Sequence, residues 1–277
     1  MDNLQNRLGK TRETTGEHWV HRYANGLVVH TDPFMRRDTA RVLPIGGPQD
    51  VIMNRLVHVP DIVRNKRVLD VFAGSGVLGL LALKLGAAHV DFVDVSPRAV
   101  TFAAENCRRN EFEPSSYDVI NASVADHRAA RPYDVILANP PFVMTPPGIE
   151  GTLCSRAGPE GNDFVNVLIA RLERLLAPTG EAYIYVLQLV HDGAPLIAAI
   201  LEETLTRRAV ELTPVQDEVA PLDVYVGAYH KRFPGHSADI RDWERDLQAR
   251  YGAGLGVQHY VMHIYPRGSL PTAPNAA

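Results

Sequence analysis

The amino-acid sequence predicts an α/β fold in which a mainly parallel sheet carries helices on both faces. Three observations support this prediction. Short apolar runs alternate with segments of helical periodicity over residues 61–209, as is typical of parallel sheets. The first apolar run ends in a glycine-rich loop that a helical segment follows. The fourth run ends in the tetrapeptide Asn-Pro-Pro-Phe, which turns the chain into a stiff loop.

The glycine-rich loop begins where the first predicted strand, Lys66–Phe72, ends. It has the sequence Ala73-Gly74-Ser75-Gly76-Val77-Leu78-Gly79. Glycines let the backbone turn tightly and approach a ligand closely. The start of the following helix adds free amides and the positive end of the helix dipole. Asp70, Gly74 and Gly76 are therefore candidate cofactor-binding residues.

A second strand is predicted at His89–Val95, and Asp94 lies at its end, 18 residues after Gly76. An acidic residue at this place can accept hydrogen bonds from both ribose hydroxyls of an adenosine ligand. Because the loop also fits the dinucleotide fingerprint, a nicotinamide-dependent oxidoreductase is an alternative interpretation. Asp70 argues against it, because its carboxylate would repel a diphosphate but suit a ligand with an amine and a sulfonium. A structural Asp70 that accepts loop amides is a further alternative.

The remaining elements follow from periodicity and from boundary residues. The other expected strands are Gly26–His30, Tyr117–Ile120, Tyr133–Ala138, Glu181–Gln188, Leu222–Tyr229 and Val257–Tyr265. The expected helices cover residues 50–60, 80–85, 97–110, 163–177, 194–209 and 237–251. We expect residues 1–60 to form an N-terminal extension, residues 61–266 the main domain and residues 267–277 a loose tail.

Three features together resemble the class I S-adenosylmethionine-dependent methyltransferases. Val68–Gly76 is similar to the first motif of that family, and Asp94 matches its ribose-binding acid. Asn139-Pro140-Pro141-Phe142 is similar to the signature of members that methylate amino groups of nucleic-acid bases or the side-chain amide of glutamine. The resemblance covers residues 26–188 and implies a Rossmann-like, seven-stranded sheet that ends in an antiparallel edge hairpin. The helix at 237–251 would then be an insertion that either covers the substrate or protects the sheet edge.

Within that family, the pattern is similar to the glutamine-amide methyltransferases of peptide-release factors. Residues 34–39 match one of their motifs with Arg36, Asp38 and Thr39 in register, and Gly158–Asp163 is similar to a later one. The chain also departs from their pattern. The departures include Met35 in place of proline, Phe142 where tyrosine is commoner, and Ser123-Val124 in place of a carboxylate. The roughly 35 residues that precede the first motif are too few for the helical recognition domain of those enzymes.

The resemblance implies specific roles for the residues at the strand ends. The cofactor would be S-adenosylmethionine, bound by Thr39, Asp70, Phe72, Gly74, Gly76, Asp94, Val95, Ser123 and Asn139. The catalytic residues would be Asn139, Pro140 and Phe142. The Asn139 side-chain oxygen and the Pro140 carbonyl would each accept an N–H of the acceptor nitrogen and direct its lone pair toward the methyl group. Phe142 would stack on the planar acceptor.

The charge composition indicates which classes of molecule the protein acts on. A net charge of −4 and a pI near 6.3 give no bulk attraction to nucleic acid, and the basic clusters Arg36, Arg37 and Arg41 and Arg207-Arg208 are expected to be solvated. We therefore expect the acceptor to be a small molecule or a protein side chain. An amino group of an rRNA or DNA base is the alternative. A module that binds the cofactor without catalysis is a further interpretation.

Cysteine and histidine usage predicts neither a disulfide framework nor a metal site. The two cysteines, Cys107 and Cys154, are too few for a disulfide framework, and no Cys/His cluster has zinc spacing. The N-terminus lacks the pattern of a signal peptide, and the apolar runs are too short to span a bilayer. A cytoplasmic protein without membrane contact is therefore expected.

Overall fold

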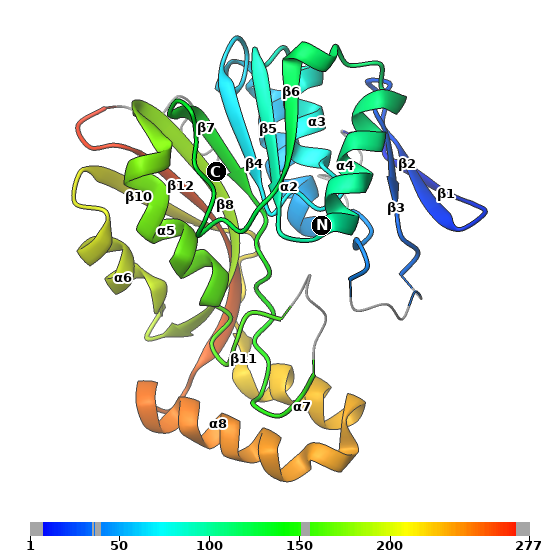
Figure 1. Cartoon of the computed structure of the whole chain (residues 1–277). Coiled ribbons are helices and arrows are strands. Elements are labelled where there is room, and N and C mark those ends of the chain that lie inside the picture. Colours follow the sequence, from blue (N-terminus) through cyan, green and yellow to red (C-terminus); the bar gives the residue numbers. More distant parts are fainter. Residues whose placement is uncertain (1–7, 35, 37–39, 151–155, 270–277) are drawn as a thin grey trace.

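The computed structural model describes residues 8–34, 36, 40–150 and 156–269, and within them one mixed sheet organises the main body. Seven strands follow one another in the order β6-β5-β4-β7-β8-β12-β10 (Figure 1). They are β4 (Arg67–Val71), β5 (His89–Asp94), β6 (Tyr117–Asn121), β7 (Tyr133–Ala138), β8 (Leu176–His191), β10 (Arg208–Pro214) and β12 (Gly256–Pro266). The two-residue strands β9 (Ala194–Pro195) and β11 (Ala220–Pro221) pair with β8 and β12.

The pairing confirms the predicted fold class. The strands β6, β5, β4, β7 and β8 pair in parallel, whereas β12 runs antiparallel to both β8 and β10. Parallel strands place their carboxyl ends at one edge of the sheet, which is where open α/β folds bind ligands.

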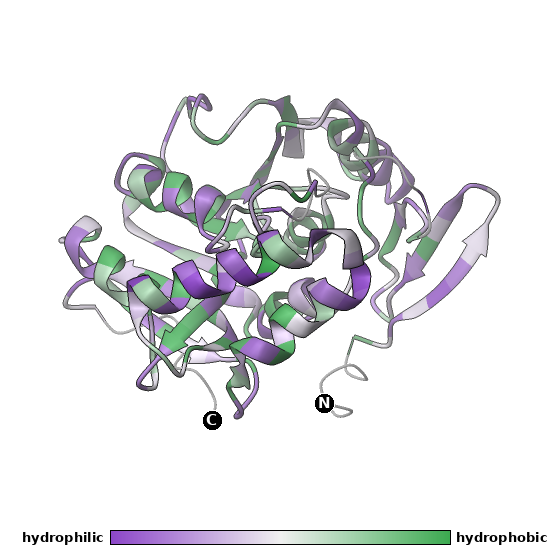
Figure 2. Cartoon of the chain, turned by 90° about the horizontal axis from the view of Figure 1, so that it is seen from below, coloured by the Kyte–Doolittle hydropathy of each residue, from purple (hydrophilic) through white to green (hydrophobic). Residues whose placement is uncertain are grey.

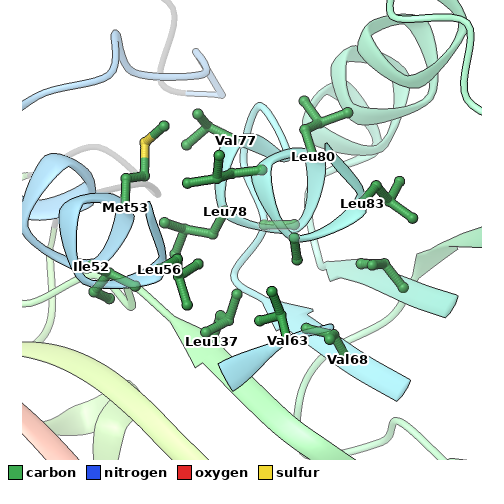
Figure 3. Close-up of a cluster of buried hydrophobic side chains, with 14 of the residues drawn as sticks. Ile52, Met53, Leu56, Val63, Val68, Val77, Leu78, Leu80, Leu83 and Leu137 are labelled. Atoms are coloured by element: carbon green, nitrogen blue, oxygen red, sulfur yellow. The ribbon is translucent and has the colours of Figure 1, made fainter. Parts of the chain in front are cut away.

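Helices cover both faces of the sheet. One face packs against α2 (Gly47–His58), α3 (Val77–Lys84) and α4 (Pro97–Arg109), and the other against α5 (Asp163–Leu175) and α6 (Ile197–Thr204). Side chains alternate along β7, so Val135 and Leu137 join the first core and Ile136 and Ala138 the second. Figure 3 shows the first core, in which Leu137 lies beneath the apolar residues of α2 and α3. Burial on both faces explains why this strand is a continuous apolar run.

The N-terminal region forms a separate three-stranded antiparallel sheet of β1 (Thr11–Thr15), β2 (His18–Arg22) and β3 (Val28–Thr31). The strand expected at 26–30 is confirmed as β3, whereas β1 and β2 were not predicted. Two carboxamides, on Asn106 of α4 and on Asn110 at its C-cap, form hydrogen bonds with the outer edge of β3. Asn110 bonds both backbone groups of Val28, and Asn106 bonds both backbone groups of His30, at 2.7–3.0 Å. These bonds replace a neighbouring strand and attach the small sheet to the main body.

The C-terminal hairpin differs from the expectation. Residues 222–229 were expected to be a strand, but they belong to the helix α7 (Leu222–Arg232). The strand that forms the hairpin with β12 is β10. The valines and tyrosines of this segment favour a strand locally. Burial follows the helical period instead, because Leu222 and Val226 are buried and Val224 is 63% exposed. The insertion in the hairpin therefore holds two helices, α7 and α8 (Ser237–Tyr251), rather than α8 alone (Figure 1).

Two boundaries near β10 also needed correction. The helix expected at 194–209 ends at Thr204, and its last residues belong to β10. Arg208, expected to be solvated, is buried and donates to the carbonyls of Gly180 at 2.6 Å and Ala177 at 2.9 Å. Those carbonyls lie at the start of β8, which begins earlier than the predicted strand at 181. Arg207 remains exposed, as predicted.

The part of the chain that the structure describes also contains three short 3₁₀ helices: η1 (Pro60–Ile62), η2 (Pro114–Ser116) and η3 (Pro234–His236). Among the described residues, no helix combines the length and apolar character needed to span a membrane.

Candidate active site

A cavity of about 270 Å³ opens at the carboxyl ends of the parallel strands. Residues from six separate segments line it, from the stretch after β3 to the start of α5. The predicted cofactor-binding residues on its wall are Asp70, Phe72, Gly74, Asp94, Val95, Ser123 and Asn139. The sequence therefore identified residues that the fold brings to one place although they are up to 69 positions apart.

The glycine loop adopts a conformation that explains its composition. Gly74 and Gly76 have φ of 56° and 81°, a left-handed region that glycine occupies without strain. A Cβ added at Gly74 would meet nothing within 4 Å, so space remains in front of this loop. Gly76 itself is buried and does not line the cavity, because it forms the N-cap of α3. Its role is therefore to shape the loop.

Asp70 makes the structural contact that one of the two interpretations predicted, and it also lies on the cavity wall, where the other interpretation places it. Its Oδ2 accepts a hydrogen bond from the Gly79 amide at 2.9 Å, which ties the end of β4 to the first turn of α3. The same residue also lines the cavity. Burial raises the pKa of Asp70 well above its usual value, and the nearby Asp94 raises it further. A cationic ligand would relieve this by favouring the ionised form of Asp70.

Asp94 is oriented at the end of β5 by two backbone amides. Its Oδ2 accepts from Gly74 at 2.9 Å and its Oδ1 from Ser96 at 2.8 Å. Burial raises the pKa of Asp94 although these hydrogen bonds favour the carboxylate. Each carboxylate oxygen can accept more than one hydrogen bond, so Asp94 retains capacity for ligand hydroxyls. The exposed side chain of Val95, next in the chain, provides an apolar surface on the cavity wall.

Asn139 follows directly after β7 and lines the cavity. Its Oδ1 is buried and accepts no hydrogen bond from the described part of the chain. A buried carboxamide oxygen without a partner is costly, and such an atom is usually satisfied by a ligand or by water. The arrangement leaves a strong acceptor without a partner on a residue of the cavity wall.

The other residues of the tetrapeptide lie differently. Pro141 lines the cavity, whereas Pro140 is buried and Phe142 does not reach the cavity wall. The Phe142 ring contacts Tyr185 and His259, with ring centroids 5.5 and 5.8 Å away. The structure therefore brings Asn139 to the cavity and places Phe142 beside an aromatic cluster that the sequence did not predict.

Part of the cavity wall comes from the segment before α2. Ala40, Arg41, Val42, Leu43 and Gln49 line it. Arg41, expected to be solvated, is half-buried and donates to the Phe34 and Arg36 carbonyls at 2.9 and 2.8 Å. No local pattern marks this wall. The resemblance at residues 34–39 was its only signal.

The loop around Arg41 is fixed by a buried ion pair. Asp32 is fully buried, and its carboxylate accepts from Arg98 at 2.5 and 2.7 Å and from the Val42 amide at 2.9 Å. Burial opposes ionisation of Asp32, but these bonds outweigh it and lower the pKa. Thr39, the remaining predicted cofactor contact, lies outside the described residues, as do Arg37, Asp38 and Cys154.

Comparison with known proteins identifies a family. A family model described as "Methyltransferase small domain" matches residues 50–205, which include the glycine loop, Asp94 and Asn139. A ribosomal protein L11 methyltransferase from Trichlorobacter lovleyi is 35% identical over 125 residues, covering 44% of this chain and 38% of that protein. A tRNA1(Val) (adenine(37)-N6)-methyltransferase from Aeromonas salmonicida is 29% identical over 122 residues, covering 43% of this chain and 51% of that protein. The chain thus spans about half of these relatives or less.

Solved structures share the fold at low sequence identity. The 16S rRNA N2 G1207 methyltransferase of T. thermophilus, solved with AdoMet and guanosine, matches with a TM-score of 0.53 and 16% identity, covering 90% of this chain and 50% of that one. The tRNA m1G37 methyltransferase of M. jannaschii matches with a TM-score of 0.55 and 12% identity, covering 92% and 59%. At these identities the likeness supports the Rossmann-like fold alone.

Proposed function

The chain belongs to the methyltransferase small domain family, and on this premise we propose that it transfers a methyl group from S-adenosylmethionine to a planar amino or amide nitrogen. The observation that carries the proposal is the buried, unpartnered Oδ1 of Asn139 on the cavity wall. An acceptor atom at that place suits a substrate that presents an N–H. The family supports this interpretation over the nicotinamide-dependent alternative, which the glycine spacing alone had kept open.

The residues on the wall fit the chemistry of the cofactor. S-adenosylmethionine supplies the methyl group on a positively charged sulfonium and also carries an amine and an adenosine. Asp94 would accept the ribose hydroxyls, and the exposed Val95 side chain would contact the adenine. Asp70 would provide negative charge near the cationic end, and the backbone at Gly74 would approach the cofactor without a side chain in the way. Phe72 and Ser123 would complete the wall.

The acceptor nitrogen requires activation because its lone pair is delocalised. Asn139 would accept one N–H through Oδ1, and the Pro140 carbonyl would accept the other. Both acceptors would hold the nitrogen with its lone pair toward the methyl group and stabilise the positive charge that develops on it. Proline suits this position because it has no N–H to compete for the acceptors. The proton leaves afterwards to water, so no general base is needed before transfer.

Two acceptor classes are each supported by a named relative. The tRNA methyltransferase from Aeromonas salmonicida supports an amino group of an RNA base. The L11 methyltransferase from Trichlorobacter lovleyi supports a protein side chain. The sequence ranked nucleic acid second because of the acidic pI, the short N-terminal lobe and the C-terminal insertion. The relatives do not support that order, since they include an enzyme named for tRNA and one named for a ribosomal protein. They support an RNA base as the acceptor more than a small molecule.

The test uses S-adenosylmethionine with an isotopically labelled methyl group. The protein is incubated with a cell extract that has been separated into small-molecule, protein and RNA fractions. We expect label in the RNA or the protein fraction, and none with heat-denatured protein. Binding of S-adenosylmethionine without label in any fraction would contradict the proposed transfer and favour the non-catalytic interpretation. Absence of cofactor binding would contradict the proposal as a whole.

A further inference from the structure

The amino ends of β5 and β6 carry a cluster of polar side chains that the proposed reaction does not use. His89 and Asp91 lie two residues apart on β5, so their side chains point to the same face of the sheet. Asp118 of β6 pairs in register with Asp91 and joins them on that face. None of the three lines the cavity, which opens at the opposite edge of the sheet. Figure 2 views the molecule from that opposite side, with the insertion helices α7 and α8 in front.

The three side chains bring one nitrogen and two oxygen atoms together. His89 Nε2 lies 3.0 Å from Asp91 Oδ1 and 3.1 Å from Asp118 Oδ2, and the ligand atoms all lie within 4.8 Å of one another. A metal ion with bonds of about 2.1 Å holds two ligands at a right angle roughly 3.0 Å apart. The observed distances therefore match those between ligand atoms that share one cation.

Both ring nitrogens of His89 face oxygen atoms that can only accept a hydrogen bond. Nδ1 lies 3.3 Å from the carbonyl oxygen of Ser115, so Nδ1 carries the proton of this contact. In the neutral ring Nε2 then has no proton, and its lone pair points at two carboxylate oxygens. Three such atoms repel one another unless a proton or a metal cation lies between them. Metal-binding histidines usually donate their other N–H to a carbonyl or a carboxylate, as His89 does.

Asp91 is oriented for this role by its other oxygen. The residue is 3% exposed, and its Oδ2 accepts from the Arg67 guanidinium and from the hydroxyl of Tyr133. Burial, and next the bond to Asp91, raise the pKa of Tyr133, so its hydroxyl keeps the proton that it donates. Within the described part of the chain, Oδ1 of Asp91 has no partner besides the His89 ring. A buried carboxylate oxygen is thus aimed at the centre of the cluster, while the exposed Asp118 leaves one side open to water.

We propose that His89, Asp91 and Asp118 bind a Zn²⁺ ion that fastens β6, the last strand of the sheet, to β5. One imidazole and two carboxylates suit Zn²⁺ better than Mg²⁺ or Ca²⁺, which prefer oxygen ligands alone, and water completes the coordination. Arg67 balances one of the two carboxylates, so negative charge remains to attract the cation. Spacing along the sequence does not indicate this site, because Asp118 joins the other two residues only through strand pairing. The site is independent of the proposed methyl transfer.

Titration of the untagged protein with Zn²⁺ tests the proposal. The protein is first treated with a chelator and dialysed, and binding is followed near neutral pH by calorimetry and by thermal unfolding. The variants are His89→Gln and Asp118→Asn, and the second should fold normally because the Asp118 side chain is 67% exposed. Asp61→Asn is the matched control, since Asp61 is also an exposed aspartate in an ion pair, with Arg64.

We expect Zn²⁺ to bind and to raise Tm, because a ligand that binds only the folded state stabilises it. His89→Gln and Asp118→Asn should each lower the affinity for Zn²⁺ at least about tenfold and remove most of the rise in Tm, whereas Asp61→Asn should change neither. Absence of Zn²⁺ binding would overturn the proposal and leave His89 as a protonated partner of the two carboxylates. Undiminished binding in either variant would overturn it as well, because the metal would not use all three residues.

Discussion

Substitution of Gly79 by alanine tests whether α3 is held against β5 as the structure shows. A Cβ at Gly79 would lie 2.4 Å from Cε1 of Phe92 and 2.8 Å from Cγ1 of Val90, and both side chains are fully buried. The Phe92 ring also packs closely against Gly76, since a Cβ built there would lie only 3.2 Å from the ring, so little space is left on that side. Helix α3 would therefore have to shift, which would stretch the 2.9 Å bond from the Gly79 amide to Asp70. This contact is the reason for the third glycine of the loop.

The magnitude follows from two opposing contributions. Overpacking of this kind costs roughly 3 kcal/mol, and alanine in place of glycine in a helix returns about 1 kcal/mol. The net loss of unfolding free energy is about 2 kcal/mol, equivalent to a fall in Tm of roughly 4–8 °C. Gly227→Ala is the matched control, because Gly227 is also helical but exposed, and its Cβ would meet nothing within 4 Å.

The assay is thermal and urea unfolding of both variants, with S-adenosylmethionine affinity measured alongside. Gly79→Ala should lower the free energy of unfolding and the affinity for the cofactor, because a shift of α3 also moves Asp70 and the glycine loop. Gly227→Ala should raise stability by up to about 1 kcal/mol. Equal effects of the two substitutions would refute the reasoning, since only the packing differs between them.

Three further predictions concern burial and charge. Arg208→Met should lower the unfolding free energy by about 3 kcal/mol, because the buried Gly180 carbonyl and the partly buried Ala177 carbonyl lose a charged donor. Arg207→Met should be neutral. Urea unfolding of both variants checks the pair, and equal losses would contradict the buried role of Arg208. Burial lowers the pKa of His21 to about 4, and the positive charge of Lys10 contributes to the shift. As the pH falls, His21 is therefore protonated in the unfolded chain before it is protonated in the folded one. The free energy of unfolding should fall between pH 6.5 and pH 4, by at most about 3 kcal/mol. His21→Asn should flatten that dependence in chemical unfolding at several pH values, and an unchanged slope would count against it. Asp94→Asn should lower the affinity for S-adenosylmethionine at least about tenfold, as measured by calorimetry. An unaltered affinity would exclude the proposed contact of Asp94 with the ribose.

The central sheet was predictable because its signals are local. The parallel strands contain apolar runs that the sequence alone reveals. Ser96 caps α4 as predicted, because its side chain accepts from the Ala99 amide. The cavity wall at Asp70, Gly74 and Asp94 followed from the same rule, because parallel strands share one carboxyl edge.

The C-terminal region was less predictable because tertiary packing overrode local preference. Residues 222–229 have the composition of a strand but form a helix. The helix buries Leu222 and Val226 in the cluster that supports the loop after the tetrapeptide. Arg208 was assigned to the surface because nothing nearby in the sequence reveals the carbonyls at the start of β8. Both errors concern contacts between residues far apart in the chain.

The aromatic cluster of Phe142, Tyr185 and His259 could not be predicted from the sequence for the same reason. Tyr185 and His259 lie on strands that join Phe142 only through the register of β8 and β12. Asn139 was identified from its motif, but its unpaired oxygen became visible only in the structure. The roles given to Asn139, Pro140 and Phe142 remain predictions.

The most direct test of the account compares Asn139→Ala with the unmutated protein. Cofactor affinity and the single-turnover rate of methyl transfer are measured on the fraction that takes up label. The account predicts an affinity within about twofold and a rate reduced by roughly 30- to 1,000-fold, the loss of 2–4 kcal/mol expected for one preorganised polar contact. A rate close to that of the unmutated protein would contradict the assignment of Asn139 and with it the proposed mechanism.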